Sequence, residues 1–161
     1  PDELLWCIAN DIGNGVVDET WVWGAGAAQS KEEALQRVCG QLYEIIFRLR
    51  TAFTLRRTEI IQGAMLVSRV WERATKAISV CSVSRFVIAA LLVAHKANAD
   101  CVHGNKQWAH VLKIQPEELN RWEAELLDIV KFDILMKEID FIRVSDVFAK
   151  RCEGILQEDN N

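Results

Sequence analysis

Residues 84–100 read SRFVIAALLVAHKANAD and include the longest run of the chain without a polar side chain. From Phe86 to Ala94 every residue is apolar, so a helix formed here has no face that tolerates water. These nine residues are far fewer than the ~20 that a membrane-spanning helix needs, and His95 and Lys96 follow them directly. We therefore expect this helix at the centre of its domain, surrounded by other helices rather than by lipid.

The composition indicates one helical domain. A chain of 161 residues with 50% hydrophobic residues can bury a sizeable core. Two prolines and eight glycines leave long uninterrupted stretches, and Asn14-Gly15 is the lone hairpin candidate. We therefore predict an all-α fold.

The charges bear on the kind of partner. The 19 basic and 23 acidic residues are well mixed and give a net charge of -4, which offers no field that attracts nucleic acid. No signal peptide or lipidation motif is visible, so we expect neither nucleic acid nor a membrane as a partner. Because the chain begins with Pro rather than Met, we expect a piece trimmed from something longer.

The cysteines predict a reducing environment. They are odd in number, widely spaced and mostly flanked by apolar residues, which is typical of buried, reduced thiols rather than of a disulfide framework. This pattern favours the nucleus and/or the cytoplasm. The five are Cys7, Cys39, Cys81, Cys101 and Cys152.

Residues 1–30 form an N-terminal arm in this interpretation. A short apolar piece, Leu4 to Ile8, precedes a loop-like tract with glycines at 13, 15, 24 and 26. These glycines lack the Gly-Lys-Ser/Thr ending of a phosphate-binding loop. Because Trp6, Trp21 and Trp23 are large apolar groups, we expect the arm to lie back on the domain or on a partner.

The first long helix is predicted to begin after Ser30. The Ser30 hydroxyl can accept from the backbone N–H of Glu33 while the Glu33 carboxylate reaches back to the cap. Apolar residues recur at three- and four-residue spacing as far as Phe53. Gly40 costs about 1 kcal/mol of helix propensity, which a close helix crossing can offset.

Four further helices are predicted from caps and apolar spacing. Thr58 can cap a helix whose stripe reaches Ile78 and includes Gly63 at its packing face, and Ser79 to Ser84 can end it. The other three follow the central helix. Their expected starts are Asn105 as a cap, Pro116 in a first turn, and Ser145 or Asp146 as a cap.

Two charges lie where the helical pattern expects apolar residues. Lys96 follows Leu92 and Val93 by four and three residues, and Glu123 interrupts a stripe between Leu119 and Leu126. They can pair with each other as an internal ion pair, which contributes little to stability. Alternatively, they lie side by side where their helices emerge and offer one donor and one acceptor to a partner's backbone.

The run LLVAHKANADCVHGNKQWAHVLKIQPEELNRWEAELLDIVKFDI, residues 91–134, resembles the heart of a cyclin box. It is most similar to the P-type (U-type) cyclins related to the yeast phosphate-pathway cyclin. Weaker similarity reaches back through Arg48 and Arg69 to about Leu35. The matching positions are Ala94, Lys96, Asp100, Asn105, Trp108, Ala109, Val111, Ile114, Glu118, Leu119, Asn120, Glu123, Leu127, Phe132 and Asp133.

The resemblance implies a single five-helix cyclin box at residues 31–135, between the N-terminal arm and a C-terminal helix and tail at 136–161. It implies a regulatory subunit, not an enzyme, that binds and activates a cyclin-dependent protein kinase by positioning the kinase's C helix, and that needs no cofactor. Kinase substrates or inhibitors are further possible partners. The implied kinase-binding residues are Lys96 and Glu123, with Val93 and Phe132 in the adjoining apolar contact.

The sequence departs from the family pattern at two places. Ser68 replaces the Asp that pairs with the arginine corresponding to Arg48, which leaves open how Arg48 is satisfied. Leu112 and Lys113 replace a Gly pair common in P-type members.

Other function classes remain as alternatives. A cyclin-fold adaptor that binds nucleic acid or scaffold proteins without a kinase is the first, and a plain helical scaffold is the second. A metal site is not expected, because the spacings of His95, Cys101, His103 and His110 fit no zinc motif. No nucleophile motif of a hydrolase occurs either.

Overall fold

Seven α-helices and one short 3-10 helix make up the described part of the chain, which is residues 2–20 and 30–158 of a computed structural model, with side chains described as far as Arg151. No strand occurs within these ranges, and the predicted all-α fold is confirmed. The elements are α1 (Glu3–Thr20), α2 (Lys31–Phe53), α3 (Arg57–Arg73), η1 (Thr75–Ala77), α4 (Val83–Asn98), α5 (Asn105–Leu112), α6 (Pro116–Val130) and α7 (Glu138–Glu158).

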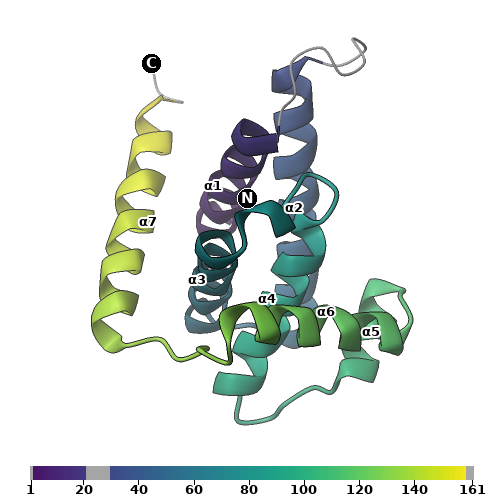
Figure 1. Cartoon of the computed structure of the whole chain (residues 1–161). Coiled ribbons are helices and arrows are strands. Elements are labelled where there is room, and N and C mark those ends of the chain that lie inside the picture. The colour runs from purple at the N-terminus through teal and green to yellow at the C-terminus, as the bar shows by residue number, and fades with distance from the viewer. Residues whose placement is uncertain (1, 21–29, 159–161) are drawn as a thin grey trace.

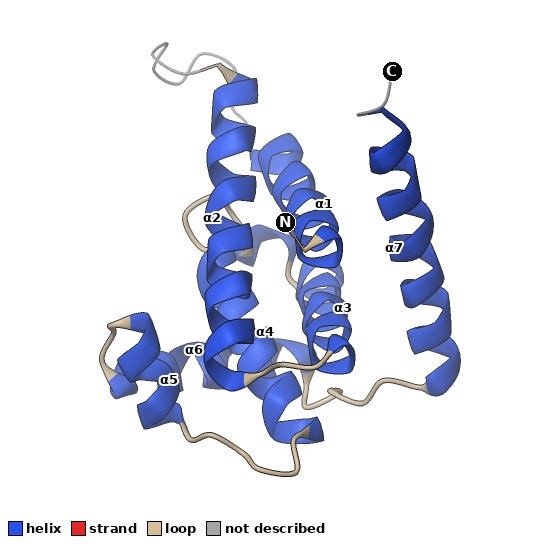
Figure 2. Ribbon diagram, turned by 180° about the vertical axis from the view of Figure 1, so that it is seen from behind, coloured by secondary structure: helices blue, strands red, loops and turns tan. Residues whose placement is uncertain are grey.

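Helix α4 lies at the centre of a five-helix group, α2 to α6. It packs against α2, α3 and α6, while α5 packs against α6. Helix α1 lies along α2, and α7 lies outside α1 and α3. Figures 1 and 2 show from opposite sides that α5 and α7 mark opposite flanks of the molecule. This arrangement agrees with five helices flanked by two extensions.

The central helix is confirmed in its position and its burial. Every residue from Phe86 to Ala94 is buried, and His95 continues the buried run with 2% of its surface exposed. Because no face of α4 can meet water, only its ends reach the surface. Its carboxyl-terminal end, where Lys96 and Asn98 lie, is therefore one of the two parts available to a partner. None of the described helices is long and apolar enough to cross a bilayer.

Helix α1 corrects the expectation of a loop-like tract after Ile8. Gly13 lies so close to α2 that a Cβ there would be 2.5 Å from Cys39 Sγ, and Gly15 lies against the ring of Trp71. The glycines thus permit close helix packing, which outweighs their poor helix propensity. Trp6 meets Tyr43 edge-on at 5.6 Å, so this part of the arm lies back on the domain as expected. Trp21, Trp23, Gly24 and Gly26 are outside the described residues.

The predicted capping box of α2 is present. Glu33 N–H donates to Ser30 Oγ at 3.1 Å, and Ser30 N–H donates to Glu33 Oε2 at 3.3 Å. The expected close crossing at Gly40 is wrong, because no atom would lie within 4 Å of a Cβ there. At Gly63 the expectation is confirmed, since a Cβ would meet Leu91 Cδ2 at 2.7 Å.

Helix α3 differs from the prediction at both ends. It begins at Arg57 and not after Thr58, because the Glu59 carboxylate accepts the Arg56 backbone N–H at 2.6 Å and so satisfies the helix start. It ends at Arg73, and Ile78 is buried from outside the helix. Ser68, in the middle of the helix, is exposed.

Of the predicted starts of the last three helices, one is confirmed and two are wrong. Pro116 occupies the first turn of α6 as expected. Asn105 is the first residue of α5 and not its cap, since Gly104 takes the cap position and its N–H donates to Gln107 Oε1. Helix α7 begins at Glu138, so Ser145 and Asp146 lie inside it and do not cap it.

The cysteines divide into buried and exposed thiols. Cys7 and Cys39 are buried, as predicted, and burial raises the pKa of the Cys39 thiol. Cys81 and Cys101 are exposed instead, because they lie in the segments just before and just after α4. The thiols of Cys39, Cys81 and Cys101 are free.

Candidate functional site

Lys96 and Glu123 lie together where α4 emerges from the core. Lys96 Nζ donates to Glu123 Oε1 at 2.6 Å, across the contact between α4 and α6. The Lys96 side chain is 35% exposed and that of Glu123 16% exposed. The sequence-based expectation that these two charges share one place is confirmed, and the pair lies at the surface.

Asn105 holds the other oxygen of the Glu123 carboxylate in place and is itself bonded to Asn120. Asn105 Nδ2 lies 2.7 Å from Glu123 Oε2 and 2.7 Å from Asn120 Oδ1. Asn105 comes from the first turn of α5, and Asn120 and Glu123 lie one turn apart on α6. Both Glu123 oxygens therefore have donors, and the carboxylate has a fixed orientation. Sequence reasoning read Asn105 only as a helix cap and matched Asn120 without a role.

Phe132 and Val93 have opposite environments. Phe132 follows the end of α6, with 72% of its surface exposed and a left-handed φ of 57°. Val93 has 3% exposure and packs in the core. It is not available to a partner in this structure, so we correct its assignment from the partner contact to the support of α4. Phe132 remains at the surface as the resemblance implies.

Helix α3 holds the segment that carries Phe132. Gln62 Nε2 donates to the Ile134 carbonyl at 2.7 Å. Arg69 donates to the carbonyls of Asp133 at 2.6 Å and Leu135 at 2.8 Å. These bonds to main-chain oxygens fix the backbone that follows the exposed ring.

Arg73 adds a third contact from the same face of α3. It donates to the Val130 carbonyl at the end of α6 and to Asp133 Oδ2 at 2.7 Å. Sequence analysis singled out Arg69 only as part of the family match. The spacing of Gln62, Arg69 and Arg73, all on one helical face, is the signal that points to a polar role.

The exposure of Arg48 explains how it is satisfied although Ser68 replaces the Asp of the family pattern. Both Ser68 and Arg48 are exposed, on α3 and α2 respectively, so water can satisfy the Arg48 guanidinium. Leu112 and Lys113 end α5, where Lys113 adopts a left-handed conformation with φ of 58°. The segment before Pro116 is therefore a short connection between the end of α5 and the start of α6.

The histidines near α4 form a hydrogen-bonded group instead of a metal site. His95 Nδ1 lies 2.8 Å from Glu59 Oε1, and its Nε2 accepts from the backbone N–H of His103 at 3.1 Å. His110 is exposed on α5. Among the residues that the structure describes, no three His, Cys, Asp or Glu side chains gather in a way that could hold a metal ion.

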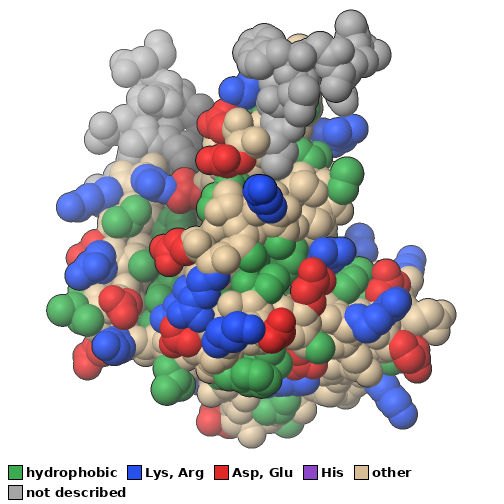
Figure 3. All heavy atoms as spheres, in the orientation of Figure 1, with side chains coloured by type: hydrophobic (Ala, Val, Ile, Leu, Met, Phe, Trp, Pro, Cys, Tyr) green, Lys and Arg blue, Asp and Glu red, His purple; other side chains and the backbone are tan. Residues whose placement is uncertain are grey.

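One face of the molecule is mixed in charge. On the face drawn in Figure 3, positive and negative side chains are interspersed, and hydrophobic side chains reach the surface between them. Two large apolar side chains, Phe132 and Leu135, are exposed after the end of α6, and Leu135 is 76% exposed. Exposed apolar groups and a held ion pair are both features suited to contact with another protein.

Comparison with known proteins identifies the family. The sequence profile of the cyclin family matches residues 51–134, which is just over half of the 161-residue chain. The chain is also similar to Cyclin-P1-1 of Oryza sativa subsp. japonica, with 31% identity over 87 residues. Those residues are 54% of this chain but 31% of the rice protein, so the chain matches about a third of that relative's length. No solved structure matches. The match covers α3 to α6 and the pair that they present, and the chain therefore belongs to the cyclin family, with the rice relative supporting its place among the P-type cyclins.

Proposed function

We propose that this chain binds a cyclin-dependent protein kinase and activates it by holding the kinase's C helix inward. The observation that carries the proposal is the Lys96–Glu123 pair, which is tightly bonded at 2.6 Å and yet leaves 35% of the Lys96 side chain exposed. An ion pair at the surface contributes only about 0–1 kcal/mol to folding. Its residues are therefore free to serve a contact outside the fold.

The chemistry of the pair suits recognition of a helix end or a loop. An ammonium donates to backbone carbonyls and a carboxylate accepts from backbone N–H groups, and such charge-assisted bonds are stronger than neutral ones. Asn105, which is itself bonded to Asn120, already orients the Glu123 carboxylate, so less conformational entropy is lost when a partner binds. Phe132, which follows the end of the helix that carries Glu123, supplies an exposed aromatic anchor.

Activation in this proposal is a shift of the kinase population. An active kinase needs its own Lys–Glu pair and its metal-binding Asp aligned with ATP, and the position of the C helix controls that alignment. A partner that binds the aligned state more tightly than the misaligned state favours it by the difference in affinity. The chain performs no chemistry of its own, and we place it in the nucleus and/or the cytoplasm.

Truncating either charged side chain shows whether the pair serves partner binding or folding. Lys96→Ala or Glu123→Ala is expected to weaken kinase association by ~2–5 kcal/mol, the usual cost of removing one side of a desolvated charged contact. The free energy of unfolding is expected to change by less than ~1 kcal/mol, because the pair is partly exposed. Affinity purification with the kinase identified by mass spectrometry, alongside thermal melting, measures both quantities.

Glu125→Ala is a matched control on the same helix. Glu125 Oε1 accepts from Arg85 at 3.0 Å, also between α6 and α4, and the two side chains are 39% and 37% exposed. Removing this pair is expected to leave kinase association unchanged. If Glu123→Ala lowered the melting temperature but left kinase capture intact, the Lys96–Glu123 pair would be a fold contact only. A gel shift on duplex DNA at moderate salt would instead support the adaptor class.

A further inference from the structure

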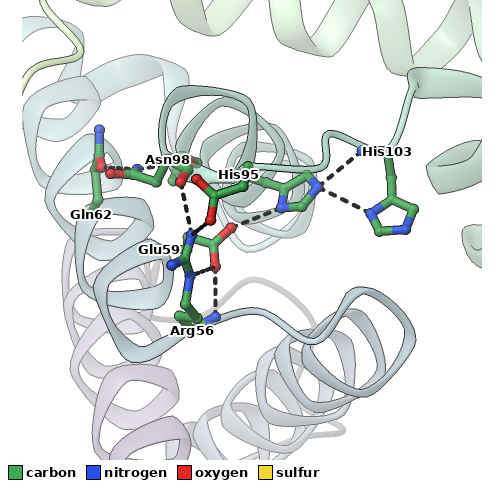
Figure 4. Close-up of polar contacts among 8 residues, drawn as sticks. Arg56, Glu59, Gln62, His95, Asn98 and His103 are labelled. Carbon is green, nitrogen blue, oxygen red and sulfur yellow. Dashed lines mark hydrogen bonds and ion pairs between the residues drawn. The ribbon is translucent and has the colours of Figure 1, made fainter.

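A buried polar group includes His95, the residue before Lys96 on α4. The side chains of His95 and Glu59 are 3% and 2% exposed, and their atoms Nδ1 and Oε1 are 2.8 Å apart. Figure 4 shows the group, in which Glu59 points to one side of the His95 ring and His103 lies at the other side. His95 neighbours Lys96 on α4, with one side chain inside and the other at the surface.

The hydrogen bonds determine which nitrogen of His95 carries the proton. Nε2 faces the backbone N–H of His103 at 3.1 Å, and a backbone N–H can only donate, so Nε2 must be the acceptor. An imidazole carries at least one proton, which must then be on Nδ1. Nδ1–H donates to Glu59 Oε1, while Glu59 Oε2 accepts the Arg56 backbone N–H. Glu59 thus selects the tautomer that can hold His103.

This bond ties the loop between α4 and α5 to the core. His103 is two residues before Asn105, and its ring stacks on that of His95 with centroids 5.3 Å apart. Phe53 flanks the His103 ring at 5.1 Å. The first turn of α5 therefore starts from an anchored residue, and the position of Asn105 depends on that anchor.

A closed circuit of contacts results. It runs from His95 to His103, along the chain to Asn105, across to Glu123 at 2.7 Å, and back to Lys96 at 2.6 Å, next to His95. Each step is a hydrogen bond or a short piece of backbone. This circuit is a route by which a change at His95 can reach the Glu123 carboxylate.

We propose that Glu59 and His95 are positioning residues of the docking site: Glu59 sets the tautomer of His95, and His95 holds the loop 99–104 so that Asn105 orients Glu123 toward the partner. The role of these residues in docking rests on the proposed function. The hydrogen-bond arrangement around His95 can be tested in the free protein. The charged or titratable groups that face His95 are Glu59 from α3 and His103 from the loop, and Arg56 reaches Glu59 from the helix start.

Two substitutions of His95 separate its two hydrogen bonds. His95→Asn places an amide near the position of Nδ1 and ends short of Nε2, so it keeps a donor for Glu59 and loses the acceptor for His103. His95→Gln reaches the position of Nε2 and keeps that acceptor. We expect His95→Asn to speed hydrogen exchange of the His103 backbone amide roughly tenfold, the effect of one lost hydrogen bond. With His95→Gln the rate stays within about threefold of the original rate.

The free protein tests the mechanism without any kinase. Long-range ¹H–¹⁵N spectra of the unmodified chain should show the His95 proton on Nδ1, and the Asn105 side-chain amide signal should shift in His95→Asn but not in His95→Gln. A proton on Nε2, or unchanged His103 exchange in His95→Asn, would overturn the proposal. The spectrum of the unmodified chain decides the tautomer even if the variants fail to fold.

Kinase capture tests the consequence separately. The kinase recovered with the unmodified chain should bind His95→Asn about tenfold more weakly, and His95→Gln should restore most of that loss. Equal capture by both variants, with the His103 exchange difference intact, would refute the positioning role. Absence of a kinase from the unmodified chain would refute the proposed function instead, and the free-protein spectra would identify that case.

Discussion

The substitution Gly63→Ala tests the helix contact on which the site is built. Gly63 lies in the interior of α3, where it faces α4, so replacing it with Ala gains about 1 kcal/mol of helix propensity. The new Cβ would lie 2.7 Å from Leu91 Cδ2, 3.3 Å from its Cγ and 3.5 Å from its Cα. Leu91 is buried, so its side chain can give way only by disturbing the packed core around it, and overpacking of this kind costs ~1–3 kcal/mol. We expect a net loss of about 0–2 kcal/mol of unfolding free energy.

Gly40→Ala is the matched control for helix propensity. Gly40 lies in the interior of α2, and no atom would lie within 4 Å of its new Cβ. It should therefore show the gain of about 1 kcal/mol alone. For a chain of this size, 1 kcal/mol shifts the melting temperature by roughly 2–4 °C.

Urea unfolding followed by far-UV circular dichroism measures both variants. The difference in unfolding free energy between Gly40→Ala and Gly63→Ala is expected to be about 1–3 kcal/mol. If the two variants were equally stabilised, α3 and α4 would not approach each other as closely as described. The reasoning that places Gln62 and Glu59 against α4 and its neighbouring loops would then fail.

Two further predictions concern the bonds from Arg69 to the segment after α6 and the cysteine thiols. Arg69→Met keeps the aliphatic stem but removes the bonds to two loop carbonyls, so amide exchange across residues 133–137 should rise roughly tenfold, while Arg57→Met at the exposed start of the same helix should leave it unchanged. Iodoacetamide should label exposed Cys81 and Cys101 in the folded protein but Cys39 only after denaturation, because burial raises the pKa of the Cys39 thiol and keeps it protonated. Peptide-resolved mass spectrometry checks this, and rapid native labelling of Cys39 would contradict its burial.

The parts of the fold that sequence predicts well are those with only one compatible environment. A helix that is apolar on every face, as from Phe86 to Ala94, can lie only inside a core. Lys96 and Glu123 were identifiable because each is a charge on an otherwise apolar stripe. Their mutual contact followed from the need of each for a partner of opposite charge.

The sequence predicts poorly those residues whose neighbours along the chain already suggest a local role, because that role hides a long-range contact. Asn105 at a helix start reads as a cap, and only the packing of α5 on α6 brings its amide to Glu123. Gly13 and Gly15 read as loop residues, and only the neighbouring Cys39 and Trp71 reveal that they permit close packing. Long-range contacts of this kind have no periodic signal along the chain.

Helix α3 links the two sides of the proposed docking surface. Glu59, Gln62, Arg69 and Arg73 lie on one helical face, with spacings of three, seven and four residues. Through His95, Glu59 holds the loop before α5, while the other three hold the segment after α6 that presents Phe132. Because Gly63 sets how closely this helix approaches α4, a shift of α3 would move both supports at once. The position of the Lys96–Glu123 pair between them is therefore a property of the α3–α4 contact as much as of the pair itself.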